Sequence, residues 1–124
     1  MNDAMQKFIE ELVLAFPALE PVVAESREDN YGETLPHLIL ADTVRWLARG
    51  GPQRRELAGP LLAWLERAYE QGNRDVRDLI VVSGVEMIPN PGDRGAWLRE
   101  LLGPVLSAFD PWNGSSNSGP NIVP

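Results

Sequence analysis

The single histidine, His37, is the residue whose surroundings most resemble a catalytic arrangement. Glu33 precedes it by four residues and Asp42 follows it by five, so the side chains of a small acid–base hydrolase occur in one short stretch. At 100° per residue, however, His37 and Asp42 point about 140° apart on a helix. A structural role for His37, as a cap or hydrogen-bonding partner near a helix start, is therefore favoured, and a hydrolase centred on Glu33, His37 and Asp42 is the alternative.

A second set of polar residues lies within strongly apolar sequence. Asp42 falls in the middle of an apolar helical stripe, where an unpaired carboxylate would be costly. Arg45 follows three residues later and can reach the same side of the helix. Glu86 lies in another apolar segment and calls for a partner in the same way. We predict that Asp42, Arg45 and Glu86 are buried, in an ion pair that holds helices in register or, alternatively, in a polar functional pocket.

Negative charge is concentrated in the first third of the chain. Residues 1–33 carry eight acids and two bases, whereas residues 34–109 carry nine of each. Five of the acids surround a short predicted helix and the turn after it: Glu20, Glu25, Glu28, Asp29 and Glu33. This segment is predicted to bind a basic protein partner, with an ordinary solvated surface as the alternative.

The composition narrows the classes of function. The chain has 124 residues, no cysteine and a net charge of −7. Without cysteine there is no disulfide framework and no thiolate metal site, and one histidine makes a poor transition-metal site, so we expect neither metal nor cofactor. The negative charge argues against nucleic-acid binding. No signal peptide and no apolar run of membrane-spanning length is seen, so we expect no membrane association and a cytoplasmic location.

Apolar residues recur at helical spacing along most of the chain. Helices are expected at about residues 3–16, 18–28, 34–49, 53–71, 74–88 and 94–109. Residues 74–88 are apolar nearly all round and are predicted to form the central helix, although the run Ile80–Val82 would also suit a strand. Pro60 and the Gly103–Pro104 step are expected to bend the helices that contain them.

These patterns predict an all-α protein of five or six helices, arranged as an irregular bundle or as a short helical-hairpin array. Residues 1–112 would form a single helical domain. The Pro-, Asn-, Gly- and Ser-rich residues 113–124 would form a disordered C-terminal tail.

Three motifs resemble a known family. They are Phe16-Pro17-x-Leu19; Gly32-Glu33-x-Leu35-Pro36-His37-Leu38 followed by Asp42-x-x-Arg45-Trp46; and Asp75-Val76-x-x-Leu79-Ile80-x-Val82-Ser83 followed by Glu86. Over about residues 8–109 they resemble a bacterial family of small, acidic, uncharacterised proteins, a domain of unknown function similar in general look to toxin-immunity proteins. Gly84 departs from the pattern, which has a bulky aromatic there, and we expect it to loosen the central helix. The resemblance implies no catalytic residue.

Together these observations predict a protein-binding module, in the form of an immunity-type inhibitor of a basic bacterial toxin, rather than an enzyme. The small hydrolase and a structural or regulatory homodimer remain as alternatives. The sequence leaves the partner and the oligomeric state open.

Overall fold

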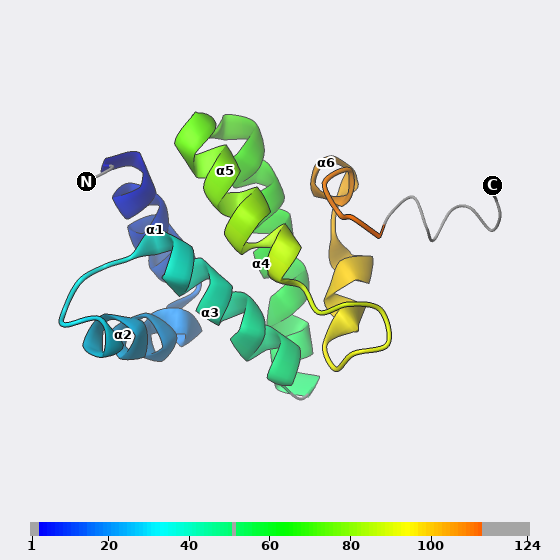
Figure 1. The fold of residues 1–124 in the computed structure, drawn as a ribbon, viewed down its shortest axis with the longest axis horizontal. Coiled ribbons are helices and arrows are strands. Elements are labelled where there is room, and N and C mark those ends of the chain that lie inside the picture. Colours follow the sequence, from blue (N-terminus) through cyan, green and yellow to red (C-terminus); the bar gives the residue numbers. More distant parts are fainter. Residues whose placement is uncertain (1–2, 51, 113–124) are drawn as a thin grey trace, which may run out of the picture.

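The computed structural model describes residues 3–50 and 52–112, and within those ranges it is helical with no strand (Figure 1). The α-helices are α1 (Asp3–Ala15), α2 (Glu20–Asp29), α3 (Pro36–Arg49), α4 (Pro52–Gln71), α5 (Arg74–Ser83) and α6 (Pro104–Ser107). The 3-10 helices are η1 (Pro17–Leu19), η2 (Val85–Met87) and η3 (Ala96–Leu101). The all-α class is confirmed. Counting helices of four residues or more, the described part of the chain has seven, because η3 joins the six α-helices, so the predicted five or six is wrong.

The helix at the centre of the packing is α3, which contacts α1, α2, α4 and α5 (Figure 1). Its side chains Ile39, Leu40, Val44 and Leu47 are at most 2% exposed, so α3 is buried on more than one side. The prediction that residues 74–88 form the central helix is wrong. There α5 turns one face to solvent and leaves Val82 49% exposed.

The early end of α5 falls at a glycine. A Cβ at Gly84 would collide with the carbonyl oxygen of Ile80, so no larger residue fits there without a shift of the backbone. Gly84 thus permits the backbone conformation in which the helix stops at Ser83 and the chain continues into the single turn η2. The family pattern led us to expect that Gly84 loosens a long central helix. Instead, Gly84 lies directly after the end of the short helix α5. At the other end, the side chain of Asn73 caps α5 by accepting a hydrogen bond from the Val76 N–H at 3.0 Å.

The predicted helix at 94–109 is divided into η3 and α6 by an extended step at Leu102 and Gly103. A Cβ at Gly103 would collide with the carboxylate of Glu66 on α4, so this glycine permits a close approach between distant parts of the chain. By contrast, α4 runs through Pro60 without a break.

Buried apolar side chains from every described helix form one hydrophobic cluster around α3, including Ile9 and Leu12 of α1, Leu61 and Leu65 of α4, and Leu106 of α6. No helix in the described ranges is long and apolar enough to cross a membrane. The predicted tail, residues 113–124, lies outside the described residues.

Candidate functional site

The five acids predicted to bind a partner are all exposed. Glu20, Glu25, Glu28 and Asp29 lie on α2, and Glu33 lies in the turn that follows. In residues 3–50 and 52–112 the ion pairs are Asp42–Arg45 and Arg99–Asp110, so none of the five carboxylates is neutralised by a neighbour. We call these five residues the acidic surface. Their charge is fully available to a partner, and exposure alone also fits a solvated surface.

Tyr31 projects from the middle of this acidic segment. It is 99% exposed, and its φ of 57° places it in the left-handed region. The turn is closed by the N–H of Gly32, which donates to the carbonyl of Arg27 at 2.7 Å, and by the Asn30 amide, which donates to the carbonyl of Ser26 at 2.7 Å. A left-handed non-glycine residue costs roughly 1–2 kcal/mol, so a wholly solvated tyrosine is held here at the expense of stability. The sequence predicts a turn in this region but gives no sign of the exposed ring.

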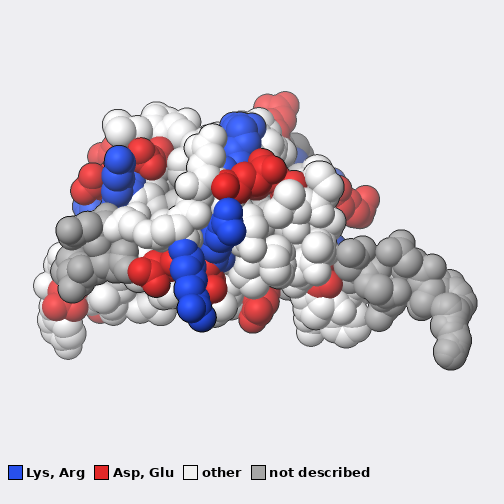
Figure 2. All heavy atoms as spheres, turned by 90° about the horizontal axis from the view of Figure 1, so that it is seen from above, with Lys and Arg blue, Asp and Glu red and all other residues white. Residues whose placement is uncertain are grey.

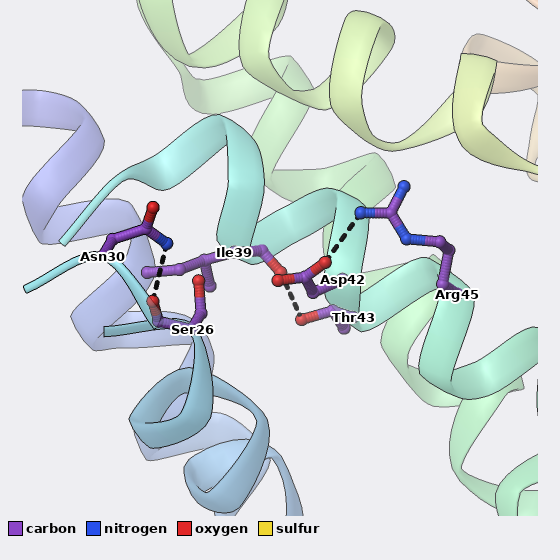
Figure 3. A network of polar contacts seen from close by, with 6 residues as sticks. All are labelled: Ser26, Asn30, Ile39, Asp42, Thr43 and Arg45. Carbon is purple, nitrogen blue, oxygen red and sulfur yellow. Dashed lines mark hydrogen bonds and ion pairs between the residues drawn. The ribbon is translucent and has the colours of Figure 1, made fainter. Parts of the chain in front are cut away.

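Asp42 and Arg45 form the expected ion pair, with Arg45 Nη2 2.7 Å from Asp42 Oδ1 (Figure 3). The predicted burial is wrong, because the two side chains are 39% and 41% exposed. Their face of α3 borders a hollow beside α2 instead of the core. Glu86 is exposed, so its predicted burial is also wrong. Because α5 ends at Ser83, Glu86 lies in the separate turn η2. It is therefore not part of the apolar helix that the sequence predicted around it.

The hollow between α2, α3 and the start of α4 has a volume of about 370 Å³ and is the candidate site. Its charged and polar lining comes from Glu25, Ser26 and Asp29 of α2, from Asp42, Arg45, Trp46 and Arg49 of α3, and from Arg54 of α4. We call it the α2–α3 hollow. The Arg54 guanidinium lies 4.1 Å from the centre of the Trp46 ring and donates a 2.6 Å hydrogen bond to the Trp46 carbonyl. Glu25 and Asp29 of the acidic surface thus line the same hollow as the predicted Asp42–Arg45 pair.

Ser26 is the least expected residue of the hollow. It is 3% exposed, and its hydroxyl has no hydrogen-bond partner in the part of the chain that the structure describes. Figure 3 shows the hydroxyl directed from α2 toward α3, while the backbone carbonyl of Ser26 accepts from Asn30. Buried hydroxyls are normally paired, so this one calls for a partner. The sequence holds one signal for it, since Ser26 follows Val23 by three residues and Leu19 by seven and so shares their buried helical face.

Among the residues whose burial the structure describes, the buried carboxylates are Glu66 and Asp110, which no sequence pattern singled out. The two carboxylate oxygens of Glu66 accept the N–H groups of Val105 and Leu106 at 2.8 and 2.9 Å, and they thereby cap the start of α6. Asp110 Oδ2 lies 2.7 Å from Arg99 Nε, with side-chain exposures of 4% and 16%. Asp110 Oδ1 also accepts a hydrogen bond from the Trp112 N–H at 3.0 Å, so both carboxylates are engaged within the fold. For Glu66, the one sequence feature that could have indicated burial is its position directly after the core residue Leu65.

Glu33, His37 and Asp42, the residues of the hydrolase alternative, do not contact one another in the described structure. The Nδ1 of His37 is hydrogen-bonded to Ser83 Oγ at 2.6 Å, which ties the start of α3 to the end of α5. Asp42 pairs with Arg45, and Glu33 is exposed, so no contact in the described ranges joins Glu33, His37 and Asp42. Ser83 is 5% exposed and so is inaccessible as a nucleophile. Among the described residues, no group of three or more His, Asp or Glu side chains could hold a metal ion.

A family model matches residues 9–109, nearly the range over which the sequence motifs suggested a resemblance. The chain belongs to the family described as "Domain of unknown function (DUF7674)". The match includes the acidic surface and the α2–α3 hollow, so both lie inside the family domain. No curated protein and no solved structure matches the chain.

Proposed function

We propose that this protein is a protein-binding module that meets a basic surface of its partner through the acidic surface on α2. The observation that carries the proposal is that all five carboxylates are exposed and that no ion pair within the described residues engages them. Unengaged like charges on one short segment repel each other, and an opposite surface relieves that repulsion. The same charge disfavours nucleic acid as the partner.

Tyr31 offers the proposed interface an aromatic side chain that could contribute affinity, to which exposed charges alone contribute little. Complementary charge mainly speeds encounter, whereas affinity comes from a few well-packed side chains, of which tyrosine is among the commonest. A fully exposed tyrosine in a strained turn, between Asp29 and Glu33, is placed to act as such an anchor. The proposed interface therefore has an aromatic centre and an acidic rim.

The form of binding that fits these properties best is inhibition, and we propose an immunity-type inhibitor of a basic bacterial toxin that acts in the cytoplasm. An inhibitor of this kind needs a preformed complementary surface and no catalytic group. The engaged states of His37 and Asp42 agree with a protein that binds without performing chemistry.

Affinity capture with charge-matched variants tests the proposal. The wild type, E25Q/E28Q/D29N and the control E56Q/E70Q/D78N are immobilised and exposed to a lysate of the source organism at low salt. Glu56, Glu70 and Asp78 are exposed and lie outside the acidic surface, so both triple variants lose three charges. We expect a basic protein to be retained by the wild type and the control and depleted at least about tenfold by the α2 variant. A partner that all three proteins retain equally would contradict the proposal.

A further inference from the structure

The α2–α3 hollow has two walls of opposite charge. On the α2 wall, Glu25 and Asp29 carry two carboxylates that no ion pair in the described ranges engages. On the opposite wall, Asp42 neutralises Arg45, which leaves the guanidinium groups of Arg49 and Arg54 without a carboxylate. The lining is therefore neutral as a whole and strongly dipolar across its width.

The two walls do not pair with each other. No ion pair joins Glu25 or Asp29 to Arg49 or Arg54 within 4.0 Å in the part of the chain that the structure describes. Opposite charges that face each other across a gap of this kind leave room for a group that carries both signs. A cation alone would meet the arginines, and an anion alone would meet the carboxylates.

The buried hydroxyl of Ser26 points to a ligand independently of these charges. Ser26 lies between Glu25 and Asp29 in sequence and lines the hollow, and the residue is 3% exposed. Its hydroxyl oxygen is closed off from water and lacks a hydrogen-bond partner among the described residues. Figure 3 shows it directed toward α3. A hydroxyl that has lost water without gaining a partner is costly, and a ligand that the hydroxyl reaches by rotation of the Ser26 side chain removes that cost.

We propose that the α2–α3 hollow binds a small zwitterion, an α-amino acid, with its ammonium group toward α2 and its carboxylate toward Arg49 and Arg54. An ammonium has three donors, and Glu25, Ser26 and Asp29 offer three acceptors. The planar guanidinium fork matches a carboxylate, and stacking on Trp46 together with the bond to its carbonyl holds Arg54 in place. The volume of about 370 Å³ lies at the lower end of the roughly 300–1,000 Å³ typical of small-molecule sites.

Titration followed by ¹H–¹⁵N NMR tests this proposal without any protein partner. The probes are the protein amino acids, first as a mixture and then singly, and the N-acetyl and carboxamide derivatives of each that binds. We expect saturable shifts of the amides of residues 25–29 and 42–49 with at least one free amino acid. Removal of either charge by acetylation or amidation should weaken binding at least about tenfold, because each derivative leaves one wall unpaired. No saturable shift with any amino acid at millimolar concentration would overturn the proposal, and so would equal binding of the derivatives.

Variants separate this site from diffuse attraction by the acidic surface. Ser26→Ala removes a hydroxyl that makes no bond in the described structure, so the melting temperature should be unchanged or higher while ligand affinity falls several-fold. E25Q/D29N should weaken binding at least about tenfold, and E28Q/E33Q, which removes two charges outside the hollow, should leave it within about twofold. Equal losses in the two double variants, or unaltered binding by Ser26→Ala, would overturn the proposal. None of these results depends on whether the acidic surface binds a protein.

Discussion

In residues 52–112 the buried carboxylates of Glu66 and Asp110 are each held by donors, whereas in residues 3–50 the carboxylates of Glu25 and Asp29 border a hollow without a partner in the described structure. The first region has nine acids and seven bases, and the second has nine acids and four bases. On the face seen from above in Figure 2, positive and negative side chains are intermixed. The contrast teaches that the buried carboxylates of this fold are already satisfied, while the exposed carboxylates of the acidic surface are unengaged and lie close together on α2 and the turn after it.

The largest loss of stability is expected from Asp110→Ala. Removal of this carboxylate leaves Arg99, 16% exposed, with a bond to the Pro89 carbonyl but no counter-charge. Breaking one half of a buried ion pair costs about 3–5 kcal/mol. Urea denaturation would measure the free energy of unfolding, with the exposed Asp93→Ala as control. A loss below about 1 kcal/mol would show that this pair does not anchor the region after η3.

Glu66→Ala should cost slightly less, roughly 2–4 kcal/mol, because it removes the acceptors of two backbone N–H groups at the start of α6. Glu66→Gln keeps one acceptor oxygen and should recover about half of the loss. Glu70→Ala, at an exposed position on the same helix, is the matched control. Chemical denaturation checks all three variants, and equal stabilities of Glu66→Ala and Glu70→Ala would rule out the capping role.

His37→Ala should lower stability by about 1–2 kcal/mol, because the buried Ser83 hydroxyl loses its partner. Ser83→Ala combined with His37→Ala should cost no more than the single histidine change, since the orphaned hydroxyl is then absent. Thermal melts of the single and double variants measure this coupling. Additive losses would show that the bond between α3 and α5 contributes nothing to stability.

The smallest effect is expected at the half-exposed pair. Asp42→Ala should change the free energy of unfolding by less than about 1 kcal/mol, because the charges at both ends of this ion pair remain solvated. A double-mutant cycle with Arg45→Ala would give the coupling energy directly. A coupling of about 2 kcal/mol or more is on the order expected of a buried pair. It would mean that Asp42 stabilises the fold as the buried carboxylates of residues 52–112 do, and it would contradict the contrast between the two regions.

The properties that the sequence predicted correctly are local ones. Helical spacing of apolar residues located α1 to α4, and simple counting of charges located the acidic surface. Pairing of Asp42 with Arg45 followed from their spacing of three residues on one helix.

The early end of α5 is a local feature, at Gly84, whereas the other errors involve contacts between distant residues. The division of the last predicted helix depends on Glu66, about forty positions earlier in the chain, which holds the N–H of Leu106. The apolar residues around Asp42 indicated correctly on which face of α3 it lies. Whether Asp42 is buried there depends on how closely α2 covers that face, and a hollow remains between the two helices. Ser26 shares a helical face with Leu19 and Val23, but its isolation from water without a partner results from the packing of α2 against α3.

The measurement that tests the central claim most directly is the association rate constant with the captured basic partner, followed against salt concentration for three proteins. At low salt, the wild type and E56Q/E70Q/D78N should associate at least about tenfold faster than E25Q/E28Q/D29N, with similar dissociation rates. The difference should shrink as salt screens the charges. Equal association rates for the three proteins at low salt would show that the acidic surface lies outside the interface and would contradict the account.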